Sequence, residues 1–257
     1  MPRFSATPPL LRLDTWRSRV ELPTLLLIVL VAGGLWLFVE LADAVQEGDT
    51  GAFDRWLLLS LRTPGDPGDP LGPGWLEEMG RDFTALGGVG VLTLMTLLAS
   101  GFLLLQGKPR AAALLLAAVA GGLVFSTLLK LGFDRPRPDL VPHGSRVYTA
   151  SFPSGHSMLS AVAYLTAGGL LARVQPRRRV KGYLLFAAVL LTVLVGISRV
   201  YLGVHWPTDV LGGWAAGGVW AALCWIVASW LQNRGKVEGD DFEPPETGPP
   251  LDRPPRA

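Results

Sequence analysis

Charged residues and cysteine are both scarce in this sequence, and each shortage excludes a class of protein. Only 17% of the 257 residues are charged, 49% are hydrophobic, and the mean hydropathy is positive. This balance differs from that of a soluble domain and indicates a polytopic membrane protein. A formal net charge of +2 is too small to imply nucleic-acid binding. The single cysteine, Cys224, excludes an intramolecular disulfide and a metal cluster held by cysteines.

Six apolar segments approach the length of about 20 residues that a helix needs to cross the hydrocarbon core of a membrane. They predict an all-α polytopic membrane bundle with six transmembrane helices. The predicted spans are residues 23–43, 88–106, 111–130, 157–173, 182–199 and 209–231. The first span lacks the small-residue cleavage site that follows the short apolar stretch of a signal peptide, so we expect it to be retained.

The uneven distribution of lysine and arginine predicts the orientation of these spans. Basic residues cluster before the first span, between the second and third, between the fourth and fifth, and after the sixth. By the positive-inside rule these parts are cytoplasmic, so the connections 44–87, 131–156 and 200–208 face the other side. We therefore expect a multi-pass protein of the inner (cytoplasmic) membrane.

Three regions are predicted along the chain. They are a basic cytoplasmic leader at residues 1–22, a membrane domain at 23–232 and a cytoplasmic tail at 233–257. The tail is rich in proline, glycine and acidic residues and has almost no apolar ones, so it is predicted to be disordered. Two weakly amphipathic pieces in the first outer connection, residues 53–62 and 75–86, predict short helices at the membrane interface, with an ordered loop as the alternative.

His205 and Asp209 lie four residues apart at the start of the sixth predicted span, a separation that places two side chains on one face of a helical turn. There the carboxylate can keep one imidazole nitrogen protonated and leave the other free to attack, as in acyl-transfer triads. Attack by that nitrogen on phosphorus would form a phosphohistidine. The alternative is that His205, beside Trp206, is a half-buried interfacial histidine.

The run Pro153-Ser154-Gly155-His156 precedes the fourth predicted span, where unpaired backbone NH groups and the helix dipole favour an anion. Gly155 lets the backbone approach a phosphate closely, and Ser154 can donate its hydroxyl. His156, as an imidazolium, can protonate a departing alkoxide. The alternative is that these residues only cap a helix.

Lys130, Arg137 and Arg199 supply positive charge at the same predicted membrane face. Guanidinium groups bind phosphate oxygens in a bidentate way and stabilise the charge that develops on them. Snorkelling to the interface is the alternative for Lys130. A solvated polar face accounts for the other ionisable residues of this connection, which we leave unassigned: Asp134, Arg135, Asp139, His143 and Arg146. No spacing of His, Asp or Glu demands a metal, and none is predicted.

Together these residues form three motifs, Lys130-x6-Arg137-Pro138, Pro153-Ser154-Gly155-His156 and Ser198-Arg199-x5-His205-x3-Asp209. The set resembles the three-part signature of the type 2 phosphatidic acid phosphatase superfamily, complete and in order. The resemblance implies His205 as nucleophile, Asp209 as its orienting partner and His156 as general acid. It implies catalysis without a divalent metal or other cofactor, and phosphate binding by Lys130, Arg137, Ser154, Gly155 and Arg199.

The expected function is that of an integral membrane lipid phosphatase acting at the periplasmic or outer side. Its expected partners are the bilayer and a phosphorylated lipid, such as phosphatidic acid or phosphatidylglycerol phosphate. Undecaprenyl diphosphate, a cell-wall lipid carrier, is the alternative substrate. The alternative from another class is a non-enzymatic protein that binds or moves phosphorylated lipids, although binding alone needs no acid and no oriented nucleophile. The sequence does not indicate an oligomeric state.

Overall fold

The computed structural model describes residues 22–139 and 150–234. Nearly all of the predicted leader and tail lies outside these residues, as do His143 and Arg146. The described elements, in chain order, are α2 (Leu22–Glu47), α3 (Gly51–Ser60), β1 (Arg62–Thr63), β2 (Asp66–Pro70), α4 (Gly74–Ala85), α5 (Val89–Leu105), α6 (Pro109–Lys130), α7 (Gly155–Ser160), a π-helical turn (Ala161–Leu165), α8 (Thr166–Arg173), α9 (Arg178–Tyr201) and α10 (Pro207–Asn233).

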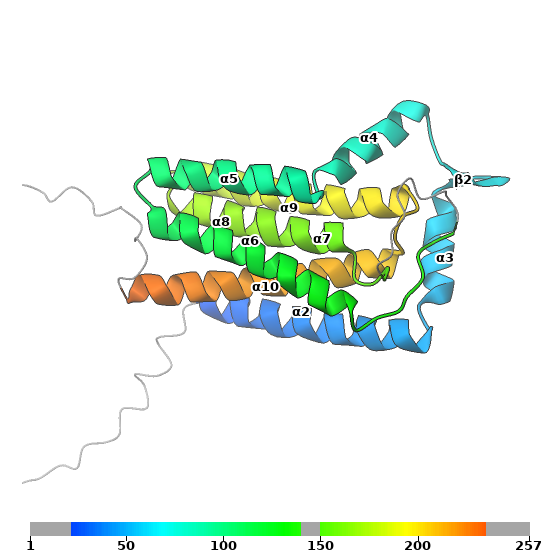
Figure 1. The fold of residues 1–257 in the computed structure, drawn as a ribbon, viewed down its shortest axis with the longest axis horizontal. Coiled ribbons are helices and arrows are strands. Elements are labelled where there is room, and N and C mark those ends of the chain that lie inside the picture. Colours follow the sequence, from blue (N-terminus) through cyan, green and yellow to red (C-terminus); the bar gives the residue numbers. More distant parts are fainter. Residues whose placement is uncertain (1–21, 140–149, 235–257) are drawn as a thin grey trace, which may run out of the picture.

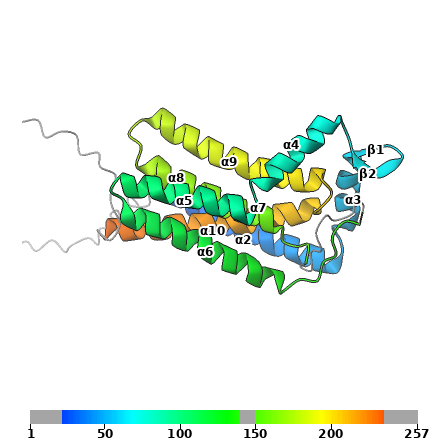
Figure 2. The same ribbon diagram turned by 45° about the horizontal axis from the view of Figure 1, so that its top comes forward.

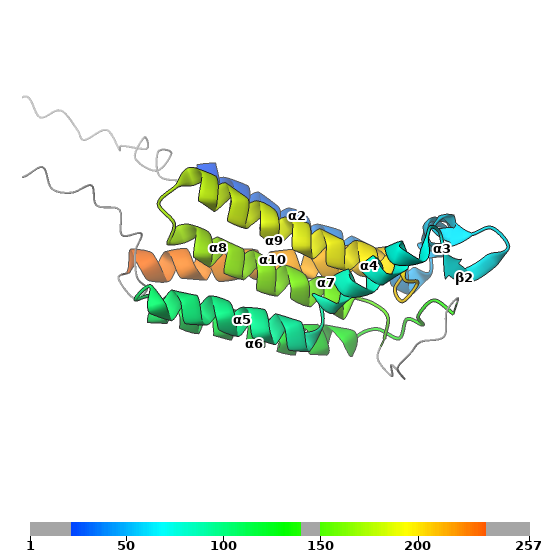
Figure 3. The same ribbon diagram turned by 90° about the horizontal axis from the view of Figure 1, so that it is seen from above.

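The long helices form a bundle and run along a common axis (Figure 1). Helices α7 and α8, joined by the π-helical turn, lie at the centre and contact α5, α6, α9 and α10. Helix α10 packs against α7 and also against α2. Seen from above, α8 and α10 lie between α9 and the pair α5–α6 (Figure 3). The central position of α7 and α10 is what brings the second and third motifs together.

The outer surface of the bundle is apolar. Large side chains such as Leu26, Trp36 and Leu128 are more than half exposed, as expected for a surface that faces lipid. Within residues 22–139 and 150–234, four helices are long and apolar enough to cross a membrane, namely α2 from Leu25 onward, α6, α9 and α10. The bent pair α4–α5 makes a fifth if it counts as one span. The predicted helical membrane bundle is confirmed in outline. The remaining predicted span, 157–173, corresponds to α7 and α8 with their π-helical turn.

Glycine residues set the spacing between the central helices. Gly213 and Gly217 of α10 face α7 so closely that an added Cβ would lie 2.7 Å from the carbonyl oxygen of Ser154 and 2.5 Å from that of Met158. Because lipid supplies no hydrophobic force between helices, such close approach and the van der Waals contact it allows stabilise the bundle.

The bend between α4 and α5 is fastened to the central helix. The axes of α4 and α5 are bent by 57°. Tyr164, in the π-helical turn, donates its hydroxyl to the carbonyl oxygen of Leu86 at the break, 2.7 Å away. This hydrogen bond satisfies a carbonyl near the end of α4, where helical partners are lacking.

The first outer connection contains helices at both predicted positions, α3 and α4, with a short antiparallel hairpin between them (Figure 2). The hairpin was not predicted, because β2 reads Asp-Pro-Gly-Asp-Pro and these residues are depleted in strands. Arg62 of β1 donates hydrogen bonds to the carbonyl oxygens of Val200 and Tyr201, at 3.4 and 2.9 Å. A buried cation thus attaches the hairpin to the negative end of α9.

All three motifs lie at one end of the bundle. Figure 1 shows the hairpin, α3, α4, the end of α6, the start of α7 and the turn from α9 to α10 at this end. The start of α2, the end of α10 and the turns joining α5 to α6 and α8 to α9 lie at the opposite end. The fold therefore gathers residues that are far apart in the sequence around a single site.

We predict that Gly217→Ala destabilises the protein and that the neighbouring Gly218→Ala does not. A Cβ at 217 would meet the Met158 carbonyl oxygen at 2.5 Å, whereas nothing lies within 4 Å of a Cβ at 218. Overpacking of this kind costs about 1–3 kcal/mol. Thermal unfolding of both variants in the same detergent measures the difference, and equal midpoints would contradict the close packing of α10 on α7.

Candidate active site

A cavity of about 880 Å³ lies at the end of the bundle that holds the three motifs. Six of the predicted site residues line it: Lys130, Arg137, Gly155, His156, Arg199 and His205. Apolar residues such as Val89, Leu123, Leu131, Phe133 and Leu159 form much of the remaining wall. The polar residues Ser126, Thr127 and Asp134 also line it, so Asp134, left unassigned from the sequence, lies at the cavity. The other two predicted residues, Ser154 and Asp209, are fully buried behind the wall. The cavity is thus cationic in one part and apolar in another.

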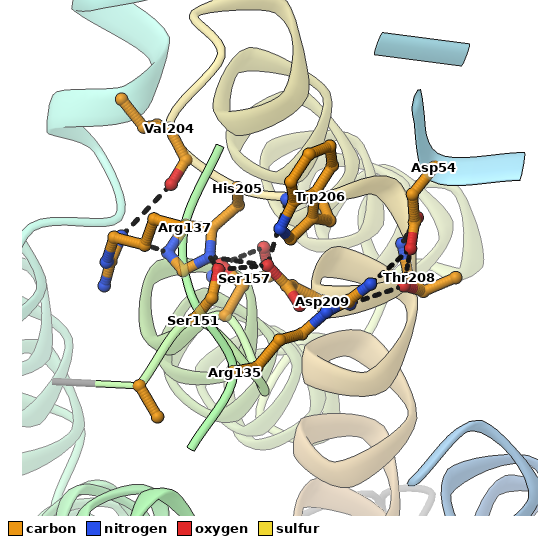
Figure 4. A network of polar contacts seen from close by, with 12 residues as sticks. Asp54, Arg135, Arg137, Ser151, Ser157, Val204, His205, Trp206, Thr208 and Asp209 are labelled. Atoms are coloured by element: carbon orange, nitrogen blue, oxygen red, sulfur yellow. Dashed lines mark hydrogen bonds and ion pairs between the residues drawn. The ribbon is translucent and has the colours of Figure 1, made fainter. Parts of the chain in front are cut away.

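The neighbours of His205 determine which of its nitrogens carries the proton (Figure 4). Nδ1 lies 3.2 Å from Oδ2 of Asp209, and Nε2 lies 3.0 Å from a guanidinium nitrogen of Arg137. An arginine can only donate, so Nε2 accepts and Nδ1 carries the proton. Nε2 is therefore the nitrogen with the free electron pair.

His205 is buried in a way that keeps its imidazole neutral. Its pKa is lowered to about 3, chiefly because burial disfavours the charged form, and the positive charges of Arg199 and Arg137 act in the same direction. The hydrogen bond and negative charge of Asp209 act in the opposite direction and do not compensate. At neutral pH the ring is in the form that can attack phosphorus.

Asp209 is surrounded by hydrogen-bond donors at the N-terminus of α10. Its Oδ2 accepts hydrogen bonds from the Ser151 hydroxyl at 2.5 Å and the Trp206 backbone NH at 2.9 Å, and contacts His205. Its Oδ1 accepts one from Arg135 at 2.7 Å. The first turn of a helix also favours a carboxylate, through its unpaired NH groups and dipole. The charge and orientation of this group are therefore well determined.

The second motif forms the start of α7. Ser154 is its N-cap, and the Ser154 hydroxyl accepts hydrogen bonds from the backbone NH and hydroxyl of Ser157, at 3.5 and 2.9 Å. Its own NH donates to the backbone carbonyl of Asp209 at 2.9 Å, which joins the second motif to the third. His156 lines the cavity and makes no hydrogen bond to another described residue, so its imidazole is available to a ligand.

Three cationic side chains surround the cavity and have neutral partners. Lys130 donates to the carbonyl oxygen of Ala150 at 3.1 Å, Arg137 to that of Val204 at 3.1 Å, and Arg199 to the hydroxyl of Thr84 at 2.9 Å. Within residues 22–139 and 150–234, none of the three forms an ion pair with a carboxylate. Positive charges arranged in this way favour an anionic ligand. In the same residue ranges, no group of three His, Cys, Asp or Glu side chains is placed to hold a metal ion.

Several residues of this site were not predicted from the sequence. The assignment of Arg135 to a solvated face is wrong, because its side chain is only 12% exposed and pairs with both Asp54 and Asp209. The signal was present in the run Arg-Pro-Arg-Pro, where prolines stiffen the segment around both arginines. Ser151 and Thr84 carry no such signal, since their roles arise from neighbours distant in the sequence.

The comparisons with known proteins agree with this geometry. The model of the PAP2 superfamily matches residues 111–233, which contain all three motifs. The chain is 36% identical over 146 residues to phosphatidylglycerophosphatase B of Bacillus subtilis strain 168, a match that covers 56% of this chain and 70% of that protein. It is 30% identical over 178 residues to lipid A 1-phosphatase of Rhizobium etli, covering 60% of this chain and 72% of that protein.

A solved structure extends the similarity to the fold. The crystal structure of a transmembrane PAP2 type phosphatidylglycerolphosphate phosphatase from Bacillus subtilis matches with a TM-score of 0.68 and 29% identity, covering 79% of this chain and 98% of that one. With its apolar helices, the chain is an integral, multi-pass membrane protein. The predicted family and phosphatase class are confirmed. The chain belongs to the PAP2 superfamily.

Proposed function

We propose that this protein hydrolyses the phosphomonoester or diphosphate of a membrane lipid through a phosphohistidine on His205. One observation carries the proposal: a neutral imidazole oriented by a buried carboxylate shares a cavity with a second histidine and three cations. A protein that only binds or moves phosphorylated lipids needs the cations but neither the oriented nucleophile nor the second histidine. The arrangement therefore favours an enzyme.

In the first step, Nε2 of His205 gives its electron pair to phosphorus, and the bond from phosphorus to the lipid oxygen breaks. Burial and the charges of Arg199, Arg137 and Lys130 lower the pKa of His156 to about 3, so it is neutral before the substrate binds. The bound phosphate offsets these charges, His156 takes a proton from the phosphate or from water, and it gives this proton to the lipid oxygen. The lipid leaves as an alcohol or, from a diphosphate, as a monophosphate. The phosphorylated imidazole is positively charged, and Asp209 offsets this charge through Nδ1.

In the second step, water attacks phosphorus. His156, now neutral, accepts a proton from the water, the bond between phosphorus and Nε2 breaks, and its electron pair returns to Nε2. Inorganic phosphate leaves, and both histidines regain their initial protonation states.

Lys130, Arg137 and Arg199 bind the non-bridging oxygens and stabilise the charge that develops on them in both transition states. Arg137 donates to Nε2, and a phosphate that binds takes over this donor and releases the electron pair for attack. Gly155 keeps space beside Lys130, since a Cβ there would lie 3.4 Å from Cε of the lysine. Ser154 contributes through the cap of α7.

The apolar wall of the cavity supports a lipid substrate. Leu123 and Leu131 line the cavity and are also 41% and 79% exposed on the outer surface of the bundle, so the cavity borders the lipid phase. The relatives from Bacillus subtilis, named for phosphatidylglycerol phosphate, favour a glycerophospholipid bearing a terminal phosphate.

We further propose six membrane spans, with α7–α8 as the fourth and the active site on the periplasmic or outer side of the cytoplasmic membrane. The basic turns that join α5 to α6 and α8 to α9 lie at the end opposite the site, which supports a cytoplasmic position for that end. The connection 131–156 is an exception to the charge bias, and we attribute its arginines to the site rather than to topology. Trp56 of α3 and Trp75 of α4 are 66% and 63% exposed, which supports an interfacial position for both helices. The domain boundaries 1–22, 23–232 and 233–257 remain part of this proposal.

The purified protein is expected to release phosphate from phosphatidylglycerol phosphate or phosphatidic acid, in EDTA as well as in magnesium. His205→Ala should lower the rate by about three to six orders of magnitude, because the nucleophile is lost, while lipid binding persists. Undecaprenyl diphosphate belongs in the same assay, and faster release from it would reassign the substrate. No release from any of the lipids would contradict the enzymatic proposal.

The acid role of His156 predicts a dependence on the leaving group. His156→Gln should slow hydrolysis of a lipid phosphate by about 100- to 10,000-fold, because the alkoxide departs unprotonated. With 4-nitrophenyl phosphate, whose leaving group needs no proton, the same variant should release a burst of one nitrophenolate per active site and then turn over slowly. Equal losses on both substrates without a burst would contradict the role.

The proposed orientation predicts the labelling of cysteines from outside the cell. In a Cys224→Ala background, Pro67→Cys in the hairpin should react with a membrane-impermeant maleimide in spheroplasts. Pro176→Cys, in the turn between α8 and α9, should react only after lysis. Both positions are exposed at opposite ends of the bundle, so they form a matched pair. The reverse pattern would place the active site in the cytoplasm.

A further inference from the structure

Arg135 connects the catalytic carboxylate to the first outer connection. One guanidinium nitrogen, NH1, donates to Oδ1 of Asp209 at 2.7 Å and to the hydroxyl of Thr208 at 2.8 Å. The other, NH2, donates to Oδ2 of Asp54 at 2.5 Å and to the hydroxyl of Thr50 at 3.0 Å. The planar fork of an arginine suits such a bridge between two carboxylates, which a lysine cannot reproduce.

Asp54 is the second anchor of this bridge (Figure 4). It lies in the first turn of α3, its side chain is only 1% exposed, and its oxygens also accept the backbone NH and the hydroxyl of Thr208, at 2.9 and 2.7 Å. That NH is among the first of α10 and lacks a partner within the helix. Asp54 therefore fixes Arg135 and the N-terminus of α10 at the same time.

The charges alternate along a buried row from Asp54 to Arg135 to Asp209, which ends at the imidazole of His205. With Oδ1 of Asp209 bound to Arg135, the carboxylate cannot rotate, and Oδ2 stays directed at Nδ1. Asp54 also pairs with Arg135 and offsets its positive charge. Asp209 therefore keeps enough negative charge to stabilise the imidazole of His205 when that ring becomes positively charged. Arg135 thus orients the carboxylate that contacts His205, and Asp54 offsets the charge of Arg135.

Arg135 does not touch the phosphate cavity. It lines a separate cavity of about 350 Å³ on the other side of Asp209, together with Thr50, Asp54, Arg55 and Trp206. Its backbone carbonyl accepts the NH of Ser151 at 2.8 Å, and the next carbonyl, of Pro136, accepts the indole NH of Trp206 at 2.9 Å. The segment is therefore immobilised between two residues that also contact Asp209.

We propose that Arg135 and Asp54 are positioning residues for the nucleophile: they fix the carboxylate of Asp209 and, through it, the hydrogen bond that orients Nδ1 of His205. The two arginines of Arg-Pro-Arg-Pro then contact different members of the His205–Asp209 pair. Arg135 binds Asp209 from behind, and Arg137 contacts Nε2 of His205 at the cavity. This inference rests on the proposed function for its effect on turnover, but its effect on His205 is measurable without turnover.

The direct test is nitrogen NMR of the protein labelled with ¹⁵N-histidine. The chain has three histidines, so His205→Gln identifies the resonances of His205. The wild-type protein should show the tautomer protonated at Nδ1. Arg135→Ala should keep this tautomer, because Arg137 still donates to Nε2, but its Nδ1 resonance should shift because the hydrogen bond to Asp209 is weakened. Unchanged His205 resonances in Arg135→Ala would overturn the proposal, whether or not the wild-type protein hydrolyses any lipid.

Kinetics provides the second readout. Arg135→Ala should lower kcat by about 10- to 100-fold, the range of a charge-assisted hydrogen bond, with little change in KM. Asp54→Asn should lower kcat less, and the loss in the double variant should be smaller than the product of the two single losses, because Asp54 acts partly through Arg135. Arg55→Ala removes a neighbouring charge that makes no hydrogen bond to a described residue, and it should leave kcat unchanged. A raised KM with unchanged kcat in Arg135→Ala would make Arg135 a substrate-binding residue and overturn the proposal.

Chemical rescue separates positioning from folding. The cavity beside Arg135 is large enough to admit a guanidinium ion, which should restore turnover and the wild-type His205 resonances to Arg135→Ala, while urea should restore neither. Rescue shows that the variant is folded and lacks only the bridging cation. A variant with an unchanged melting temperature that guanidinium does not rescue would overturn the proposal. If the wild-type protein releases no phosphate from any lipid, the proposed function fails, and the NMR measurement alone decides this inference.

Discussion

The buried negative charge of Asp209 is the constraint on which the site depends. A carboxylate removed from water is tolerated only where donors surround it. Here the donors come from three separate places in the sequence: Arg135, Ser151, and the adjacent His205 and Trp206, the latter through its backbone NH. The backbone carbonyl of Asp209 also accepts a hydrogen bond from the backbone NH of Ser154, in the second motif. The site therefore cannot form until the segment after α6, the start of α7 and the start of α10 have come together.

The surrounding bilayer explains how so polar a cluster can lie inside so apolar a chain. The cations and imidazoles lie at the ends of helices or in the connections that follow them, positions from which polar groups can reach water while the helices themselves face lipid. Glycines in α10 bring it against α7 closely enough for main-chain contacts between the motifs. Thr84, at the end of α4, then orients Arg199 across the cavity. The close packing of the helices thus also determines where the charged groups of the site lie.

Most of the helices were predicted from the sequence, because a long run of apolar residues indicates a helix that is surrounded by lipid. The sequence also predicted the cationic and imidazole residues of the cavity, because residue type and spacing within the motifs carry that information locally. The hairpin between α3 and α4 has no local signal, since its strands are held by Arg62 against the end of α9. Arg135 and Ser151 were missed for the same reason: their partners lie more than 50 residues away. Contacts over such distances are decided by packing, which a single sequence does not display.

The wide turn in the middle of the central helix has a geometric consequence. A π-helical turn contains one residue more than an α-helical turn, and each residue of an α-helix advances the chain by about 100° around the axis. The extra residue within Ala161–Leu165 therefore changes, by about 100°, the direction in which α8 presents Gly168 and Gly169 relative to the side of α7 that carries His156. Those glycines admit α9 and the ring of Trp225. The π-helical turn thus sets how one continuous rod directs its imidazole to the cavity and its glycines to the neighbouring helices.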